Sequence, residues 1–395
     1  MEMNNTPKRR SFFQKLLANP GFRSFTAALL CILIGLLIGY IVLLIINPDH
    51  AGKAITTILK NFMTRNRAEL RLKSFGNTLV KTAPLLLCSL SILFAYKAGL
   101  FNIGAAGQYV LGAGAALYCA LGLNLPWYVC LVAAVLAGAL LGAISGALKA
   151  YLNVNEVISC IMLNWISLYL VNLVLKDYCP VGHKDTFELG IKNSSAILPK
   201  LGLNELFGNE RVTIAIPIAI IIAVLIWIIL SKTRFGYEIK ATGYNRNAAK
   251  YAGMREKQNI ILTMVIAGAL AGIAAALLFL SDFSQWDINQ SSVPAMGFNG
   301  IAASFLGGLH PIGAIFSSFF IQHITDGGSL LDTTYYPVQI ADLISAIIIY
   351  LCGFVLFIKL KMVKASGAIP QKRPDMPAQI RHSSDNNAKT KGGDK

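Results

Sequence analysis

The chain has 395 residues, of which 55% are hydrophobic and only 14% are charged. Soluble domains carry about 25% charged residues, and the apolar residues here come in long blocks. This composition excludes a disordered protein, argues against an ordinary soluble globule, and predicts an integral membrane protein with several spans. The net charge of +16 falls between and beyond the apolar blocks, so membrane topology and anionic lipid explain it better than nucleic acid.

Cysteine usage and motif content argue against a metal site and against catalysis. Six of the seven cysteines lie inside apolar blocks, and none shows the paired spacing of a disulfide framework or a zinc site. The sequence also has no phosphate-binding glycine loop, no nucleophile elbow and no zinc-protease motif. We therefore expect no catalytic residue, and no metal or cofactor bound by this chain.

The N-terminal residues 1–24 are polar and basic, and the first apolar block follows at 25–46. No cleavage site of small residues comes after that block, so we expect a retained anchor and not a removed signal peptide. Crossing the hydrocarbon core takes about 20 apolar residues in a helix. We predict a transmembrane domain at 25–358 with ten crossings, at 25–46, 79–97, 104–123, 127–149, 156–175, 212–231, 258–281, 295–309, 311–326 and 338–358.

Two of these ten segments are weak. Segment 79–97 begins with Lys81 and contains Pro84, and segment 295–309 is short and rich in glycine. The predicted fold class remains an all-α polytopic membrane protein with about ten transmembrane helices.

The placement of lysine and arginine predicts the orientation, because cytoplasmic loops carry an excess of both. With the basic N-terminus inside, loop 232–257 is also inside and carries seven Lys/Arg against Glu238 and Glu256. Loop 176–211 then lies outside, with five basic and five acidic residues. The basic tail 359–395 returns to the inside, and its polar, Pro- and Gly-containing composition predicts disorder.

Segment 48–78 disagrees with this rule, because it falls outside yet carries six Lys/Arg. Its apolar side chains recur at helical spacing, at Ile55, Ile58, Leu59, Phe62 and Met63. This pattern predicts an amphipathic helix at the outer interface of the membrane. The alternative is that one weak span has been miscounted.

One carboxylate and two amide side chains lie in the segment 156–175, where polar groups are costly and suggest function. Glu156 could line a polar path, or it could be a carboxylate placed where the helix dipole favours it, at an N-terminus. Asn164 could face a pathway, although bridging two helices is the more ordinary role. Asn172 follows in the same segment.

Two glycine-rich stretches interrupt the apolar pattern, one at 99–108 and one at 297–311. Irregular backbone at membrane depth is tolerated only inside protein or along a cavity, so these breaks are candidates for function, with a plain tight connection as the alternative. Interrupted spans in corresponding halves point to internal repeats around a central site. Blocks 79–175 and 258–358 would start on opposite sides of the membrane, as inverted repeats do.

Glycines spaced four apart occur in two of the predicted spans. They are Gly138, Gly142 and Gly146 in one, and Gly268 and Gly272 in another. This spacing permits close helix packing, and we expect that packing to be inside the subunit.

Loop 232–257 combines small and charged residues, with Gly243 and Gly253 as breaks around Ala248 and Ala249. A short helix with such a compact face could dock into a groove on a partner. The alternative is a solvated basic loop that only satisfies the positive-inside rule.

These segments resemble a known family. The loop from Arg234 to Gly253 is similar to the ATPase-coupling loop of ABC importer permeases. Gly99-Leu100-Phe101-Asn102-Ile103-Gly104 with Gly107-Gln108 resembles the signature of the sugar and branched-chain-amino-acid permease group. Asn155-Glu156-Val157-Ile158-Ser159 with Ile161 to Trp165 resembles its nucleoside-importing branch, and Gly297 to Ala302 with Gly307 to Gly313 matches a further block. The motifs cover residues 79–326 in the order of the family.

The resemblance implies a permease subunit that translocates nucleosides or related ribose compounds by alternating access across a bacterial cell membrane. It implies four kinds of partner: an ABC ATPase that uses ATP and Mg, a second and non-identical permease subunit, a substrate-binding lipoprotein, and membrane lipid. No nucleic acid is implied. One departure from the family is Ala106, where an acidic residue is expected.

The resemblance assigns two groups of residues. ATPase coupling is expected of Arg234, Gly236, Glu238, Lys240, Gly243, Asn245, Ala248, Ala249 and Gly253. The substrate pathway is expected to use Phe101, Asn102, Gln108, Asn155, Glu156, Asn164, Trp165, Phe298 and Asn299. Amides and aromatic faces suit an uncharged nucleoside, which needs hydrogen bonds and stacking surfaces and no counter-charge.

Two other classes of function are considered. An ion-coupled secondary carrier also has broken spans, but it needs a carboxylate in the membrane, and Glu156 is the strong candidate for it. A scaffold or receptor subunit would have neither transport nor an associated ATPase.

Overall fold

The computed structural model describes residues 20–337, 343–344, 346–347, 350–351 and 353–365. Within these residues the fold is helical, with one isolated antiparallel bridge between Asp185 and Asp287. In this described part of the chain, six helices are long and apolar enough to cross a membrane. They are α2 (Pro20–Ile46), α4 (Ala68–Lys97), α6 (Trp127–Leu152), α7 (Glu156–Leu175), α10 (Ala215–Lys232) and α13 (Glu256–Phe279).

Helices also form at three further predicted segments. These are α5 (Ala105–Leu117), which continues into a π-helix at Tyr118–Gly122, α14 (Ala295–Leu306) and α15 (Pro311–Gly328). With 13 and 12 residues, α5 and α14 are too short to cross a hydrocarbon core of about 30 Å alone. The predicted tenth segment, 338–358, lies largely outside the described residues, and α17 (Val355–Ala365) includes residues that we had assigned to the tail.

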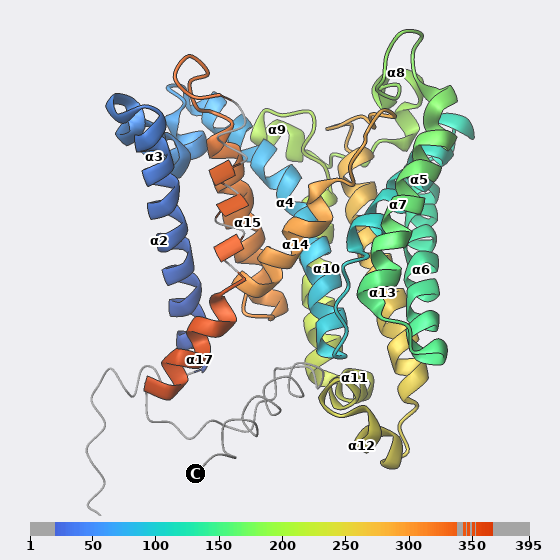
Figure 1. Ribbon diagram of the computed structural model, residues 1–395. Coiled ribbons are helices and arrows are strands. Elements are labelled where there is room, and N and C mark those ends of the chain that lie inside the picture. The colour runs from blue at the N-terminus through green and yellow to red at the C-terminus, as the bar shows by residue number, and fades with distance from the viewer. Residues whose placement is uncertain (1–19, 338–342, 345, 348–349, 352, 366–395) are drawn as a thin grey trace, which may run out of the picture.

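Helix α4, which contains the weak segment 79–97, lies at the centre of the bundle (Figure 1). Its most apolar stretch is 89% buried, against neighbours α5, α10, α13, α14 and α15. A helix buried among other helices need not be as apolar as one that faces lipid, because protein groups can satisfy its polar side chains. This explains how α4 accommodates Lys81 and Pro84.

The glycine stripes of α6 and α13 pack against each other. Gly138 and Gly142 lie against the backbone of Gly268 and Met264, and Gly272 lies against that of Ala134. A Cβ atom at any of these glycines would overlap a backbone atom of the facing helix. The expectation of close packing inside the subunit is therefore confirmed.

The breaks predicted around 99–108 and 297–311 are present. Residues 98–104 leave the end of α4 and run back along the bundle without helical structure until α5 begins (Figure 1). The chain can reverse there because Gly99 has a φ of +76°, which is unfavourable for other residues. Residues 307–310 join α14 to α15 in a tight turn.

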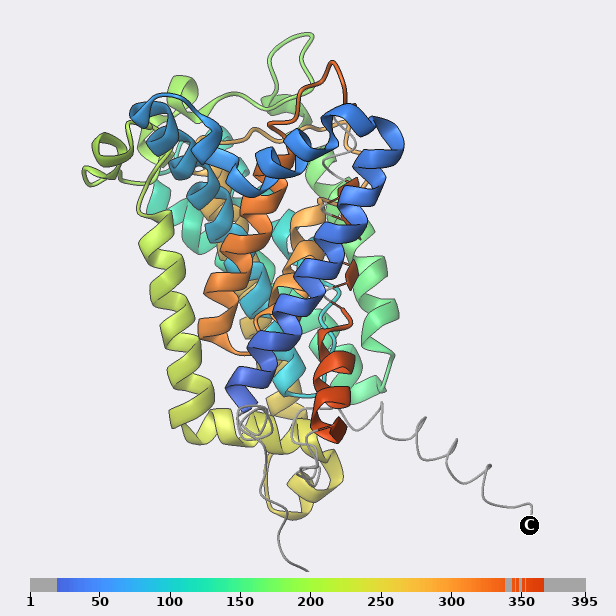
Figure 2. The same ribbon diagram turned by 90° about the vertical axis from the view of Figure 1, so that its left-hand side faces the viewer.

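Segment 48–78 is only partly the helix we expected. Helix α3 (Pro48–Lys60) buries Ile58, but Asn61 has a φ of 44°, which ends the helix, and a 3₁₀ turn follows at Asn61–Thr64. Ala51, Ala54 and Ile58 are buried against the bundle, whereas Leu59 and Met63 of the predicted stripe are exposed. The position of this segment at the membrane interface stays a prediction. Figure 2 shows this segment on the rim of the bundle, at the end opposite to α11 and α12.

The remaining helices are short and lie at the two ends. Loop 176–211 carries 3₁₀ turns at Lys176–Tyr178 and Ser194–Ala196, with α8 (Leu189–Lys192) and α9 (Leu203–Phe207). Loop 232–257 carries α11 (Arg234–Tyr244) and α12 (Arg246–Tyr251). Below, the end of the bundle that carries α11 and α12 is called the α11 end (Figure 1).

Candidate functional site

Loop 232–257 forms two short helices that are capped by their own side chains. Thr233 accepts a hydrogen bond from the Gly236 N–H at 3.0 Å, which starts α11 one residue after α10 ends. Asn245 accepts one from the Ala248 N–H at 3.0 Å, which starts α12. Such caps satisfy N–H groups that a helix leaves unpaired, so the loop has a defined shape without a partner.

The inner face of this loop packs on the ends of the long helices. Gly243 lies against the backbone of Lys97 and Gly99, where α4 ends and the chain reverses. The Asn259 amide donates to the Thr242 hydroxyl at 3.3 Å, joining α13 to α11. Loop 232–257 therefore contacts both the end of α4 and the start of α13.

Two further contacts join the loop to α6. The Arg246 guanidinium donates to the Ala150 carbonyl at 3.4 Å. The Lys257 ammonium lies 5.2 Å from the ring centre of Tyr151, within range of a cation–π interaction.

The outer face of the loop is exposed and aromatic. Tyr251 is 93% exposed and Tyr237 is 63% exposed. Arg234 and Glu238 form an ion pair at 2.9 Å. A groove of about 440 Å³ opens here, lined by Arg234, Tyr237, Glu238, Ala252, Gly253, Met254 and Arg255.

The residues expected to couple to an ATPase divide between these two faces. Arg234, Lys240, Asn245, Ala248 and Gly253 are exposed, and Glu238 is half-buried beside the groove. Gly236 and Ala249 are buried, and Gly243 is half-buried against α4. A bulky residue at Gly243 or Ala249 would therefore disturb internal packing before it tested docking.

The polar side chains at the α4–α5 break bind one another. The Asn102 amide donates to the Gln108 side chain at 2.9 Å and to the Ser91 hydroxyl at 3.0 Å. The Gln108 amide donates back to Asn102 at 3.3 Å. Both amides are buried, so in this conformation they satisfy each other's hydrogen bonds and stabilise the break.

Asn164 on α7 caps the start of α5. Its side-chain oxygen accepts from the Gly107 N–H at 2.8 Å, and its amide donates to the Ile103 carbonyl at 3.2 Å. Gly107 permits this approach, because a Cβ atom there would overlap Asn164. Asn164 bridges two segments, which is the more ordinary of its two predicted roles.

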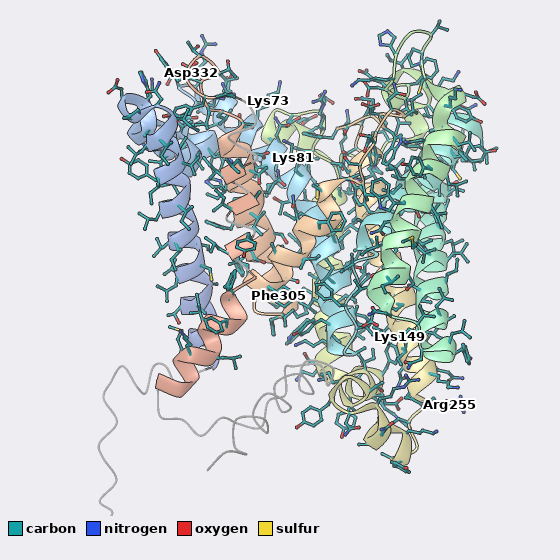
Figure 3. All side chains as sticks on the ribbon, viewed as in Figure 1. Lys73, Lys81, Lys149, Arg255, Phe305 and Asp332 are labelled. Carbon is teal, nitrogen blue, oxygen red and sulfur yellow. The ribbon has the colours of Figure 1, made fainter. Side chains whose placement is uncertain are left out.

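Glu156 is 4% exposed and forms an ion pair with Lys149 at 2.7 Å. It is the first residue of α7, after Asn155, whose side chain caps the helix by accepting from the Val157 N–H. Figure 3 shows Lys149 toward the α11 end of the bundle. This geometry favours the carboxylate at a helix N-terminus, and a buried pair of opposite charges offers no free carboxylate.

The aromatic candidates lie on surfaces that this chain leaves open. Trp165 is 39% exposed on α7 and stacks on Tyr169, with 6.0 Å between ring centres. Phe298 on α14 is also 39% exposed, while Phe101 and Asn299 are half-buried. In the described residues, no hydrogen bond joins Trp165, Phe298 or Asn299 to the side chains of Asn102, Gln108 and Asn164.

The departure at Ala106 has a steric reason. Ala106 is fully buried, and Gly297 of α14 lies directly against its backbone and its Cβ atom. A longer acidic side chain would have to displace α14. The short pair Ala106 and Gly297 instead lets α5 and α14 approach closely.

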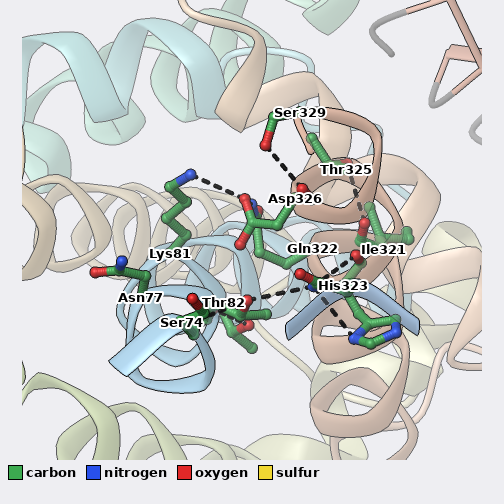
Figure 4. Close-up of polar contacts among 12 residues, drawn as sticks. Ser74, Asn77, Lys81, Thr82, Ile321, Gln322, His323, Thr325, Asp326 and Ser329 are labelled. Atoms are coloured by element: carbon green, nitrogen blue, oxygen red, sulfur yellow. Dashed lines mark hydrogen bonds and ion pairs between the residues drawn. The ribbon is translucent and has the colours of Figure 1, made fainter. Parts of the chain in front are cut away.

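Sequence reasoning missed an ion pair between the central helix and α15. The Lys81 ammonium lies 2.8 Å from Oδ1 of Asp326, which also accepts from the Gln322 amide at 3.0 Å (Figure 4). In the sequence Lys81 appeared only as a charged residue that weakened the predicted span 79–97. A cation in one predicted span and the carboxylate of Asp326 at the end of another were the available signals.

Sequence reasoning also missed a set of contacts at the end opposite to α11. We call its residues, Asn172, Lys184, Thr186, Trp286 and Asp287, the clamp. Trp286 is fully buried and donates its indole N–H to the Asn172 side chain at 2.9 Å. Its backbone pairs with Thr186, and Lys184 forms an ion pair with Asp287 at 3.0 Å. Asn172 thus fixes the segment that leads into α14.

The fold and this site define a multi-pass membrane protein. Its buried amide side chains stabilise the broken helices, and its loop at the α11 end exposes a groove and two tyrosine rings. A family model described as "Branched-chain amino acid transport system / permease component" matches residues 74–353. The chain belongs to this family of ABC transporter permeases, whose members are not themselves catalysts.

Three curated relatives show the range of the likeness. The guanosine ABC transporter permease protein NupP of Bacillus subtilis is 32% identical over 279 residues, covering 69% of this chain and 79% of that protein. The nucleoside permease protein NupB of Lactococcus lactis is 33% identical over 315 residues, covering 76% and 86%. A glucose ABC transporter permease of Haloferax volcanii is 27% identical over 344 residues, covering 84% and 87%. No solved structure matches the chain.

Proposed function

We propose that this chain is the membrane-spanning subunit of an ATP-driven importer that carries nucleosides or related ribose compounds by alternating access. The observation that supports the substrate class is the likeness to two permeases named for guanosine and nucleosides, each at about a third identity over most of its length. The residues to which we assign substrate contact below, Phe101, Trp165, Phe298 and Asn299, carry no charge, which agrees with an uncharged cargo.

The ATPase of such an importer would dock on the outer face of loop 232–257. The groove beside Tyr237 and Gly253 and the exposed ring of Tyr251 supply the contact surface. The packing of Gly243 on the end of α4 supplies a path by which ATP-driven movement would reach the centre of the bundle. In this proposal the α11 end faces the cytoplasm of a bacterial cell, and both chain termini are cytoplasmic.

A second permease subunit would complete the pathway. The exposed aromatic residues Trp165 and Phe298 and the half-buried Asn299 lie on surfaces that this chain does not cover. We assign substrate contact to these residues and to Phe101, and a bracing role to Asn102, Gln108, Asn155, Asn164 and Glu156. A substrate-binding lipoprotein would deliver cargo at the opposite end, and the bundle would contain ten crossings arranged as inverted repeats.

Uptake tests the substrate class. Cells that express the complete importer should accumulate labelled guanosine, and unlabelled nucleosides should compete where glucose and leucine do not. Competition by glucose or leucine, with none by nucleosides, would overturn the substrate class and leave the family assignment intact.

Docking is tested on exposed residues. Lys240→Glu with Tyr251→Ala should abolish co-purification of the ATPase in mild detergent while the permease still reaches the membrane. The control is Lys192→Glu with Leu206→Ala, which changes exposed residues at the opposite end. Equal loss in both variants, or loss in neither, contradicts the proposed docking face.

A further inference from the structure

Four exposed cations lie together at the end opposite to α11, between α3 and the first turns of α4. We call Arg65, Arg67, Arg71 and Lys73 the basic rim. None of the four forms an ion pair within the described residues, whereas other cations at this end do: Lys184 pairs with Asp287 and Lys200 pairs with Glu210. The rim therefore presents charge that the chain itself does not neutralise.

The backbone that carries the rim is anchored to α15. The Asn61 side chain donates to the His323 carbonyl at 2.9 Å, and the ring of His323 contacts the Leu59 carbonyl at 2.9 Å. One acidic residue, Glu69, lies in the first turn of α4, where the helix dipole stabilises a negative charge. The segment that leads into the rim is thus anchored, and within the rim the Arg71 guanidinium donates to the Arg65 carbonyl.

Exposed apolar side chains lie before these cations along the chain and between them. They are Leu59, Met63, Leu70 and Leu72. On the same flank runs α2, whose side chains Leu33, Leu37, Ile41 and Ile45 are also exposed (Figure 2). An apolar helix on the flank of the bundle, together with a rim of basic and apolar residues at one end of it, is the arrangement expected at the boundary between hydrocarbon and headgroups.

We propose that the basic rim binds the phosphate groups of anionic phospholipids. An acidic protein surface would also match the charge, but it would leave the interleaved leucines and the exposed face of α2 without an apolar partner. Lipid satisfies both, with headgroups on the cations and acyl chains on α2. Only the choice of leaflet rests on the proposed function: with α11 cytoplasmic, the lipid belongs to the outer leaflet, where the positive-inside rule does not call for cations.

Lipid selection by the purified full-length chain tests this. The chain is reconstituted in an equal mixture of phosphatidylglycerol and phosphatidylcholine, and the lipid that remains bound is measured by native mass spectrometry. Wild type should retain phosphatidylglycerol preferentially. Replacing all four rim residues with Gln should reduce that preference at least about tenfold, because each cation near an anionic surface contributes to the attraction. Replacing the ion-paired Lys184 and Lys200 with Gln should leave it unchanged.

Three results would overturn the proposal. One is an equal retention of both lipids by wild type, and another is an unchanged preference in the rim variant. The third is a rim variant that keeps its lipid preference but loses stimulation of the ATPase by the binding protein, which would assign the rim to an acidic protein. A failure of nucleoside uptake with lipid preference intact would count against the proposed function alone.

Discussion

Lys81 and Asp326 join the central helix α4 to α15, with 2.8 Å between the ammonium and the nearer carboxylate oxygen. The second oxygen of Asp326 is buried without a hydrogen-bond partner in the described structure. The C-terminal end of α4 contacts Gly243 in loop 232–257. Helix α4 therefore contacts both this loop at the α11 end and, through Lys81, Asp326 of α15.

Replacing Lys81 alone should therefore lower the free energy of unfolding more than replacing Lys81 and Asp326 together. Lys81→Met leaves a buried carboxylate unpaired and should lower the free energy of unfolding by about 2–3 kcal/mol, less than for a fully buried pair because Lys81 is one-third exposed. Lys81→Met with Asp326→Leu should recover at least half of this loss. Thermal unfolding in detergent measures both, and equal stability of the single and double variants would contradict the coupling.

Gly142 should tolerate no side chain. Gly142→Ala places a methyl group against the Met264 carbonyl of α13, and such overpacking costs about 1–3 kcal/mol. The matched control is Gly52→Ala in α3, where a Cβ atom meets nothing within 4 Å, and where alanine should be neutral or stabilising. A similar melting temperature for both variants would show that the α6–α13 contact is looser than described.

Asn164 should act through the start of α5. Asn164→Leu leaves the Gly107 N–H and the Ile103 carbonyl unpaired in a buried site, at a cost of about 1–3 kcal/mol each. Asn247→Leu, on the exposed surface of α12, is the control. Hydrogen exchange at residues 103–108 should accelerate only in the first variant, and unchanged protection there would remove the capping role.

Folding and uptake should not require the Glu156 carboxylate when its ion-pair partner Lys149 is replaced as well. Glu156→Gln alone leaves Lys149 charged and buried, so the chain should be destabilised. Glu156→Gln with Lys149→Met should fold and retain uptake, because the pair is structural. Uptake that is abolished in the well-folded double variant would support a coupling carboxylate and the ion-coupled alternative.

The clamp at the opposite end should open in acid. The Asn289 N–H and the Lys184 ammonium lower the pKa of Asp287 below its ordinary value. A lowered pKa means that the stabilisation is present above the ordinary Asp value of about 3.9 and is lost as the pH falls through the folded value. Pepsin should cleave loop 176–211 faster as the pH falls below about 4, and Asp287→Asn should be cleaved readily at every pH tested.

Much of this architecture could be predicted from the sequence because membrane burial is a local property. A run of apolar residues is apolar whatever surrounds it, so the segments at α2, α6, α7, α10 and α13 could be recognised from hydropathy. The glycine spacing of α6 and α13 likewise predicted close packing. The motifs around Phe101, Asn155 and Arg234 were sufficient to identify the permease family before any fold was known.

Only the tertiary structure decided what the polar residues do. Lys81 made α4 look like a poor span because its partner Asp326 is distant in sequence and no local pattern reports a contact between two helices. For the same reason the hydrogen bonds that Asn102, Gln108 and Asn164 make in the fold could not be predicted from the sequence. A side chain's hydrophobicity is fixed by its own atoms, whereas its hydrogen bonds and ion pairs depend on which segments the fold brings beside it.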